Sequence, residues 1–337
     1  MKHELYVLGL IVLIVIICYI MMVSSARLDG RTFHEDLLPS MYGDEFPEDE
    51  FVGGEAYDEE VEKGAKLAKD ETLVIGGLAY NLTMEQISML ERRIDYISDG
   101  WKRVIIFVYG LDSKEQYREF LIDWAKRDTR VILVPKLERS WKKENVFVKM
   151  AHLRNALHQY IDQYIKDSIK DSINEQTFFL TMDYDIGGPI SKHGILHARY
   201  LLEDKTIGVV YANGIVSDSF INTIPGFKGW CFPGLGYSYY DDLALIRNEG
   251  SDESKLTKWF SMAYGRGAKP LHVTSAYGGA GLMRPSLLKH SYDITSKTCE
   301  HHSFNRKITD LHLSIVVDPS FLLLAGCQGH HLTRKVE

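Results

Sequence analysis

Short apolar runs alternate with longer segments of helical periodicity in the part of the chain that follows residue 70. The apolar runs are candidate strands, and they are Leu73–Leu78, Val104–Tyr109, Val131–Val134 and Thr177–Met182. Candidate helices lie between them at 83–97, 114–127 and 146–169, and Thr83 and Gln86 give the first a capping-box pattern. A helix between two strands returns the chain to the same edge of the sheet, so such strands pair in parallel. The sequence therefore predicts an α/β fold whose ligands bind at the carboxyl ends of the strands.

The fourth apolar run ends in two aspartates, Asp183 and Asp185. Residues two apart in an extended segment point the same way, so these carboxylates are expected to lie together where the strand leaves the sheet. Paired carboxylates at such an edge bind Mg2+ or Mn2+ and leave coordination positions for phosphate oxygens. The alternative interpretation of so short a motif is a turn with two solvated aspartates.

The N-terminus contains an uninterrupted apolar run, Leu5–Val23, behind a short tail of residues 1–4. About 20 apolar residues suffice to cross a bilayer as a helix, so this run predicts a transmembrane signal anchor. A cleaved signal peptide is the alternative, because small residues follow the run at 24–26. Signal peptides have apolar cores of about 7 to 15 residues, and the longer run here favours the anchor. The flanking charges do not fix its orientation.

Residues 24–70 carry many acids, together with Pro39, Pro47 and paired glycines. A segment of this composition buries little apolar area, so the sequence predicts a flexible acidic stem. The formal net charge of the whole chain is -7, and the stem holds much of that excess. The remainder, 71–337, is near neutral and has neither a linker nor a repeat, which predicts a single domain and no nucleic-acid partner.

The paired aspartates resemble the Asp-x-Asp motif of nucleotide-sugar-dependent glycosyltransferases of the GT-A type. Other segments are similar to elements of that family in the same order, from the Arg-Asn helix before the acidic strand to the C-terminal histidine. They are Ala151–Leu157, Ser275–Met283, Cys299–Asn305 and Gly326–His331. The resemblance implies a Rossmann-like, mixed central sheet flanked by helices, a Mn2+ or Mg2+ cofactor and a nucleoside diphosphate sugar donor.

The resemblance also assigns the donor side of the site. Asp183 and Asp185 would bind the metal, with Asp185 essential for catalysis, and His331 or else His330 would complete the coordination. Arg154 would face the nucleotide diphosphate or steady the acidic loop, since a guanidinium grips two oxygens at once. Three glycines, which let backbone approach a ligand closely, would shape the donor pocket. These are Gly278, Gly279 and Gly281.

On the acceptor side, Glu300 is placed like the acid that takes a proton from the acceptor hydroxyl in inverting members of the family. The next position, where that pattern usually has Asp, is His301. Either Glu300 is the base or this position only binds acceptor, and a retaining enzyme needs no such base. The segment Tyr239–Arg247 has a distant likeness to fungal capsule-type mannosyltransferases, by which Asp241 or Asp242 would bind acceptor hydroxyls. An acid at a helix N-terminus is the alternative there.

The resemblance as a whole implies a metal-dependent glycosyltransferase, hexosyl or pentosyl, that transfers a sugar to a hydroxyl of a glycan or glycoconjugate. Such an enzyme would be a type II membrane protein, in contact with the bilayer through residues 5–23 and with its domain in the Golgi or ER lumen. Two alternatives stay open. One is a phosphohydrolase of the haloacid-dehalogenase type, which also uses Asp-x-Asp, and the other is a non-catalytic, membrane-anchored sugar-binding protein.

Overall fold

The structure of the protein is a computed structural model, and it describes residues 44–51, 53–139, 144–168, 176–217, 237–241, 243–247 and 266–327. The described residues form a ten-stranded sheet in the order β3-β2-β1-β4-β9-β5-β10-β8-β7, with β6 paired to β5. The strands are β1 Thr72–Leu78, β2 Arg103–Tyr109, β3 Val131–Leu133, β4 Thr177–Met182, β5 Ile207–Ser217, β6 Tyr237–Tyr239, β7 Ile246–Arg247, β8 Leu271–Ser275, β9 Ala280–Met283 and β10 Ser314–Cys327. The helices are α3 Glu55–Ala68, α4 Met84–Ser98, α5 Glu115–Arg127, α6 Val146–Ser168, α7 Lys192–Leu201 and α8 Glu300–Asp310. Short 3-10 turns lie at Glu48–Glu50 and Pro285–Leu287.

The first four strands pair in parallel, as the alternation of strands and helices predicts. β1 lies between β2 and β4, and β3 extends the sheet beyond β2. The rest of the sheet is mixed, because β9 runs antiparallel to both β4 and β5 while β10 runs parallel to β5. The protein therefore has a mixed α/β fold with one central sheet, and β4 with its aspartates lies inside that sheet.

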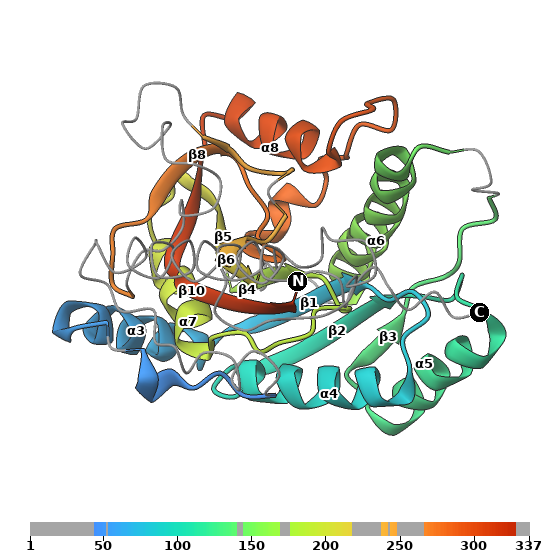
Figure 1. Ribbon diagram of the computed structural model, residues 1–337, viewed down its shortest axis with the longest axis horizontal. Helices are drawn as coiled ribbons and strands as arrows, with labels where there is room; N and C mark the ends of the chain where they lie inside the picture. The colour runs from blue at the N-terminus through green and yellow to red at the C-terminus, as the bar shows by residue number, and fades with distance from the viewer. Residues whose placement is uncertain are drawn as a thin grey trace, which may run out of the picture.

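Helices cover both faces of the sheet (Figure 1). α3, α4, α5 and α7 pack into one apolar core, and α6 and α8 pack into another on the opposite face. Strand β1 shows why two cores form, since Leu73 and Ile75 belong to the first and Val74 to the second. The start of α4 has the predicted capping box, in which the Thr83 side chain accepts from the Gln86 N–H and the Gln86 side chain accepts from the Thr83 N–H.

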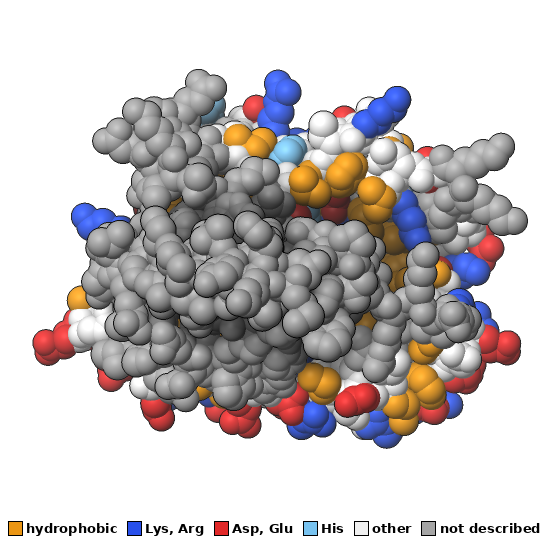
Figure 2. Space-filling model, in the orientation of Figure 1, with side chains coloured by type: hydrophobic (Ala, Val, Ile, Leu, Met, Phe, Trp, Pro, Cys, Tyr) orange, Lys and Arg blue, Asp and Glu red, His pale blue; other side chains and the backbone are white. Residues whose placement is uncertain are grey.

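The acidic segment before the domain differs from the expected flexible stem, because its described part is folded. Residues 55–68 form α3, which buries Tyr57, Val61 and Ala68 and packs against α7. The two helices approach so closely that a Cβ on Gly64 would lie 1.9 Å from the Leu196 carbonyl oxygen. Acidic side chains occupy the opposite, exposed face of α3. Figure 2 shows acidic side chains around the left and lower edges of the molecule, and α3 lies at the left in the same orientation. The segment is therefore an amphipathic helix, and its apolar face was not recognised because most of its other residues are acidic.

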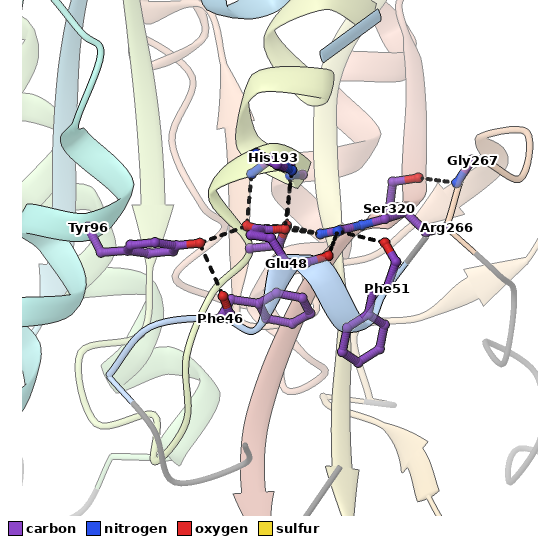
Figure 3. A network of polar contacts seen from close by, with 10 residues as sticks. Phe46, Glu48, Phe51, Tyr96, His193, Arg266, Gly267 and Ser320 are labelled. Carbon is purple, nitrogen blue, oxygen red and sulfur yellow. Dashed lines mark hydrogen bonds and ion pairs between the residues drawn. The ribbon is translucent and has the colours of Figure 1, made fainter. Parts of the chain in front are cut away.

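The chain before α3 is attached through Glu48 (Figure 3). The Glu48 carboxylate accepts hydrogen bonds from the Ser191 hydroxyl, the His193 N–H and the Tyr96 hydroxyl, and it pairs with the Arg266 guanidinium. Phe46 packs into a small buried cluster beside β5 and β10. These contacts explain why residues 44–51 belong to the folded domain.

The predicted anchor at residues 5–23, and the part of the predicted stem that ends at residue 43, lie outside the described residues. In the portion of the chain that is described, no helix combines the length and the apolar character that crossing a membrane requires.

Candidate functional site

The Asp183-Tyr184-Asp185 segment follows β4 directly at the carboxyl end of that strand. All six residues of β4 are buried, and the Asp183 N–H donates to the Gly279 carbonyl oxygen at 2.9 Å. Tyr184 is buried between the two acids, and its hydroxyl donates to the Phe107 carbonyl oxygen at 2.9 Å. Asp185 is exposed and Asp183 is half-buried. The buried tyrosine thus fixes the turn from which the two acidic side chains extend.

Arg154, on α6, connects the acidic turn to α8. Its Nη2 donates to Asp183 Oδ1 at 3.2 Å, and its Nε donates to Glu300 Oε1 at 3.1 Å. Only 5% of the Arg154 side chain is exposed, so both ion pairs are shielded from solvent. The structure therefore brings Arg154, Asp183 and Glu300 together. Of the two expected roles of Arg154, these contacts favour steadying the acidic loop over an open grip on a diphosphate.

Arg154 is the charged centre of this cluster. Burial lowers the pKa of the Arg154 guanidinium, but Tyr277, Asp183 and Glu300 raise it further, so the pKa lies well above the ordinary value. One guanidinium is shared by two carboxylates, and Asp185 adds a third carboxylate nearby in the chain. Carboxylates gathered at the end of a strand suit a cationic ligand.

Two tyrosines that the sequence reasoning did not select also hold Asp183. The Tyr277 hydroxyl donates to Asp183 Oδ1 at 2.9 Å, and the Tyr240 hydroxyl donates to Asp183 Oδ2 at 3.3 Å. Both belong to segments that the sequence had marked for other reasons, the glycine-rich run and the Tyr-Asp run. A tyrosine in a sequence is as consistent with core packing as with a polar role. No sequence signal therefore distinguishes these two tyrosines from tyrosines that only pack in the core.

The glycine-rich turn between β8 and β9 lies against both the acidic turn and β5. Gly278 and Gly279 have positive φ angles of 61° and 82°. A Cβ on Gly278 would lie 2.0 Å from the Ala212 carbonyl oxygen, and one on Gly281 would lie 2.4 Å from the Tyr211 ring. Close packing within the sheet therefore accounts for two of the three glycines, while the Gly279 carbonyl contacts the Asp183 backbone.

Glu300 and His301 open helix α8 and both point inward. Glu300 is 5% exposed, and its Oε2 lies 4.0 Å from the Cys299 Sγ. His301 is 1% exposed, and its Nε2 lies 3.7 Å from Glu300 Oε1, beyond hydrogen-bond distance. Burial, followed by the charge of Arg154, holds the pKa of His301 well below its ordinary value, so the imidazole is neutral. The family resemblance implied that His301 contacts an acceptor. In the structure its ring is buried instead, because the first turn of α8 directs it into the core.

The remaining predicted residues fall at or beyond the limits of the described chain. Asp241 lies in the turn after β6 with a φ of 60°. Burial raises the pKa of the Cys299 thiol to about 12, and the charges of Asp241 and Glu300 add to that shift. Asp242, His330 and His331 lie outside the described residues.

The donor atoms of this edge fit a hard divalent cation. Asp185 is exposed, and Asp183 Oδ2 accepts a single hydrogen bond in the residues described. Carboxylate oxygens are the ligands that Mg2+ and Mn2+ prefer, and such ions keep positions for phosphate oxygens and water. Within the described ranges, no group of three or more His, Cys, Asp or Glu side chains is arranged to hold a metal. The described part of this edge therefore offers two carboxylates, those of Asp183 and Asp185.

Comparison with known proteins gives a likeness to solved structures only. No protein-family model matches the sequence, and no curated protein matches it. One similar structure is the mannosyltransferase PcManGT from Pyrobaculum calidifontis in complex with GDP-Man and Mn2+, with 14% identity and a TM-score of 0.44 over 81% of this chain. Another is GalNAc-T7 with UDP, GalNAc and Mn2+, with 12% identity and a TM-score of 0.45 over 75% of this chain. This chain spans 66% of the first and 43% of the second. Function therefore has to be argued from the site.

Proposed function

We propose that the protein is a metal-dependent glycosyltransferase, which transfers a hexosyl or pentosyl group from a nucleoside diphosphate sugar to a hydroxyl of a glycan or glycoconjugate. One observation carries the proposal. Arg154 joins Asp183, at the carboxyl end of β4, to Glu300, at the start of α8. The family resemblance assigns the first carboxylate to metal binding and the second to proton transfer, and both contact the same guanidinium although they are far apart in the chain.

Asp185 and Asp183 would hold the Mn2+ or Mg2+ ion, which supplies positive charge to the leaving diphosphate when it is bound. Arg154 and Tyr277 keep the Asp183 carboxylate in one orientation. Arg154 also holds Oε1 of Glu300, so Oε2 is the oxygen that would accept a proton from the acceptor hydroxyl as the new bond forms. Glu300 has this role only in an inverting enzyme, and the anomeric configuration of the product distinguishes the two routes.

Further assignments complete the proposal and rest on the family resemblance. His331 or His330 would supply a third metal ligand, and Asp241 or Asp242 would bind acceptor hydroxyls. The glycine-rich turn at 278–281 would border the donor sugar. The apolar run at 5–23 would anchor the protein in the membrane, with its domain in the lumen of the Golgi or ER.

A haloacid-dehalogenase-type phosphohydrolase fits the site less well. Its nucleophile would be the first aspartate of the motif, which attacks phosphorus through an unshared carboxylate oxygen. Both oxygens of Asp183 accept hydrogen bonds, and Oδ1 accepts two of them. A non-catalytic sugar-binding protein would keep the fold and the ion cluster without turnover.

A thermal-shift screen of the full chain in detergent, against UDP-sugars and GDP-sugars with and without Mn2+, tests the proposal. One nucleotide sugar should raise the unfolding temperature only when Mn2+ is present. At a ligand concentration about 100 times Kd, binding adds about 2.7 kcal/mol to the free energy of unfolding. Failure of every nucleotide sugar to stabilise the protein would contradict the proposal, and release of phosphate from an aryl phosphate would favour the phosphohydrolase instead.

A further inference from the structure

Tyr277 lies at the centre of the candidate site, although no motif marks it. Its side chain is fully buried in the turn between β8 and β9. The hydroxyl donates to Asp183 Oδ1 at 2.9 Å and accepts from Arg154 Nη1 at 3.4 Å. The centre of the Arg154 guanidinium lies 4.7 Å from the centre of the same ring. Tyr277 therefore contacts both charged partners of the cluster at once.

These contacts restrict a side chain that is otherwise free to turn. The terminal torsion of an aspartate is broad, so the direction of its two oxygens depends on the donors around them. Tyr277 and Arg154 both donate to Oδ1 of Asp183, and this fixes that oxygen toward α6 and the glycine-rich turn. Oδ2 is then directed away from them, and Tyr240 is its donor. The orientation of the carboxylate follows from Tyr277 as much as from Arg154.

His301 contacts Tyr277 through its ring face. The two rings are stacked, with centroids 4.0 Å apart and planes 17° apart, and Tyr292 meets His301 edge-on at 5.7 Å. Among the described residues, neither nitrogen of His301 has a hydrogen-bond partner, and buried polar atoms without partners destabilise a fold. The favourable contribution of this residue is therefore its stacked ring. An aspartate at this position, as in the family pattern, would offer no ring and would place another carboxylate beside Glu300.

We propose that Tyr277 is a positioning residue of the metal and diphosphate site, which fixes the Asp183 carboxylate, and that the stacked ring of His301 holds Tyr277 in place. The inference rests on the proposed function, because it assumes that Asp183 contacts the metal and nucleotide. It adds a pair of residues that act on ligand binding through Asp183 without touching the ligand.

The test measures Mn2+ binding by electron paramagnetic resonance of the free ion, with UDP or GDP present, in the full-length protein. Tyr277→Phe removes one hydroxyl and keeps the ring. A hydrogen bond to a charged group contributes about 1.5 to 3 kcal/mol, so Kd for Mn2+ with the nucleotide should rise at least about tenfold. The matched control is Tyr211→Phe, which removes a buried hydroxyl that donates to Asn305 Oδ1 at 2.6 Å. It should lower the unfolding temperature and leave Kd unchanged.

His301 provides a second pair of variants that does not depend on the fate of Tyr277→Phe. His301→Phe keeps an aromatic ring without nitrogens and should retain the wild-type Kd, whereas His301→Leu should raise Kd several-fold. Equal Kd values for wild type, Tyr277→Phe and His301→Leu would overturn the inference and leave the proposed function standing. An increase in Tyr211→Phe as large as that in Tyr277→Phe would also overturn it. A wild-type protein that binds Mn2+ with neither UDP nor GDP would instead contradict the proposed function.

Discussion

Two buried arginines, each paired with two carboxylates, lie on opposite faces of the sheet and show what distinguishes a site from a structural contact. Arg199, on α7, makes two hydrogen bonds to Glu71 and one to Glu203, and its guanidinium lies 4.2 Å from the Phe178 ring centre. Arg154, on α6, pairs with Asp183 and Glu300 and lies over Tyr277. The local chemistry of the two clusters is nearly the same.

The clusters differ in which end of the parallel strands they occupy. Glu71 immediately precedes β1, at the amino end, whereas Asp183 immediately follows β4, at the carboxyl end where α/β folds bind ligands. Asp183 is also followed by a second acid, the exposed Asp185, whereas Glu71 is followed by the buried Thr72 of β1. We infer that the Arg199 cluster joins α7 to the sheet and that the Arg154 cluster prepares a ligand site.

The largest difference between the Arg154 and Arg199 clusters is expected when the exposed acid of each, Asp185 or Glu203, is replaced and sugar transfer is measured. Asp185→Ala should reduce metal-dependent sugar transfer by at least about a thousandfold, because a divalent cation stabilises the leaving group by several kcal/mol. Glu203→Ala removes a half-exposed acid from the other cluster and should leave transfer unchanged. Transfer assays with Mn2+ and the donor found by thermal shift measure both variants, and full activity of Asp185→Ala would refute the site.

The arginines themselves provide the next comparison. Arg154→Gln and Arg199→Gln should each lower the free energy of unfolding by about 3 to 5 kcal/mol, because each leaves a buried carboxylate unpaired. Only Arg154→Gln should also weaken binding of Mn2+ with nucleotide, since only Arg154 orients Asp183. Denaturant titration and Mn2+ binding on the same samples separate stability from function. If Arg199→Gln weakens binding as much, the distinction between the clusters is wrong.

Buried histidines on the two faces should respond to pH in opposite directions. Burial, followed by the charge of Arg154, lowers the pKa of His158 to about 3. The His158 side chain of the unfolded state binds its proton near pH 6.5, and that of the folded state only near pH 3. As the pH is lowered between these two values, the free energy of unfolding should fall by about 1.4 kcal/mol per pH unit. His158→Phe should flatten that slope in acid titrations followed by circular dichroism. An unchanged slope would mean that other groups control acid unfolding.

His197, on the face of α3 and α7, is expected to behave in the opposite way. Burial lowers its pKa, but the charge and hydrogen bond of Asp318, with help from Glu60, outweigh burial and raise it. The protonated ring then stabilises the fold fully below pH 6.5, and that stability is lost as pH rises through the raised pKa. His197→Gln should remove this dependence in thermal unfolding between pH 6 and 9. A variant that keeps the wild-type dependence would contradict the charged state of His197.

The smallest effect is expected far from both clusters, at the start of α4. Thr83→Ala removes the cap oxygen that accepts from the Gln86 N–H, and it should lower the free energy of unfolding by about 1 kcal/mol. Binding of Mn2+ with nucleotide should be unaffected. A loss of binding in this variant would show that stability alone controls the site, and it would weaken every comparison above.

The sequence predicted the parallel half of the sheet because the periodicity of strands and helices there is local. The region from β5 to β10 could not be predicted in the same way, because β9 inserts between β4 and β5 and its pairings join distant segments. Helix α3 was missed because charge dominated its composition, although Tyr57, Val61 and Ala68 lie at helical spacing on one face.

The aspartates of the candidate site could be selected from sequence, but their surroundings could not. Nothing local indicates that Arg154 reaches Glu300, because the contact depends on how α8 packs over α6. Tyr277 and Tyr240 gave no signal, since a buried aromatic residue usually belongs to a core. The inward direction of His301 likewise depends on tertiary packing rather than on its place in a motif.

Direct titration of Mn2+ tests the central claim, that the carboxyl end of β4 binds metal and diphosphate. Free Mn2+ is followed by electron paramagnetic resonance in the full-length protein, with UDP or GDP present, for wild type and Asp185→Asn. The account predicts one saturable site in wild type with one of the two nucleotides, and its loss in Asp185→Asn without a change in unfolding temperature. Equal Mn2+ binding by the two proteins, or binding by neither, would contradict it.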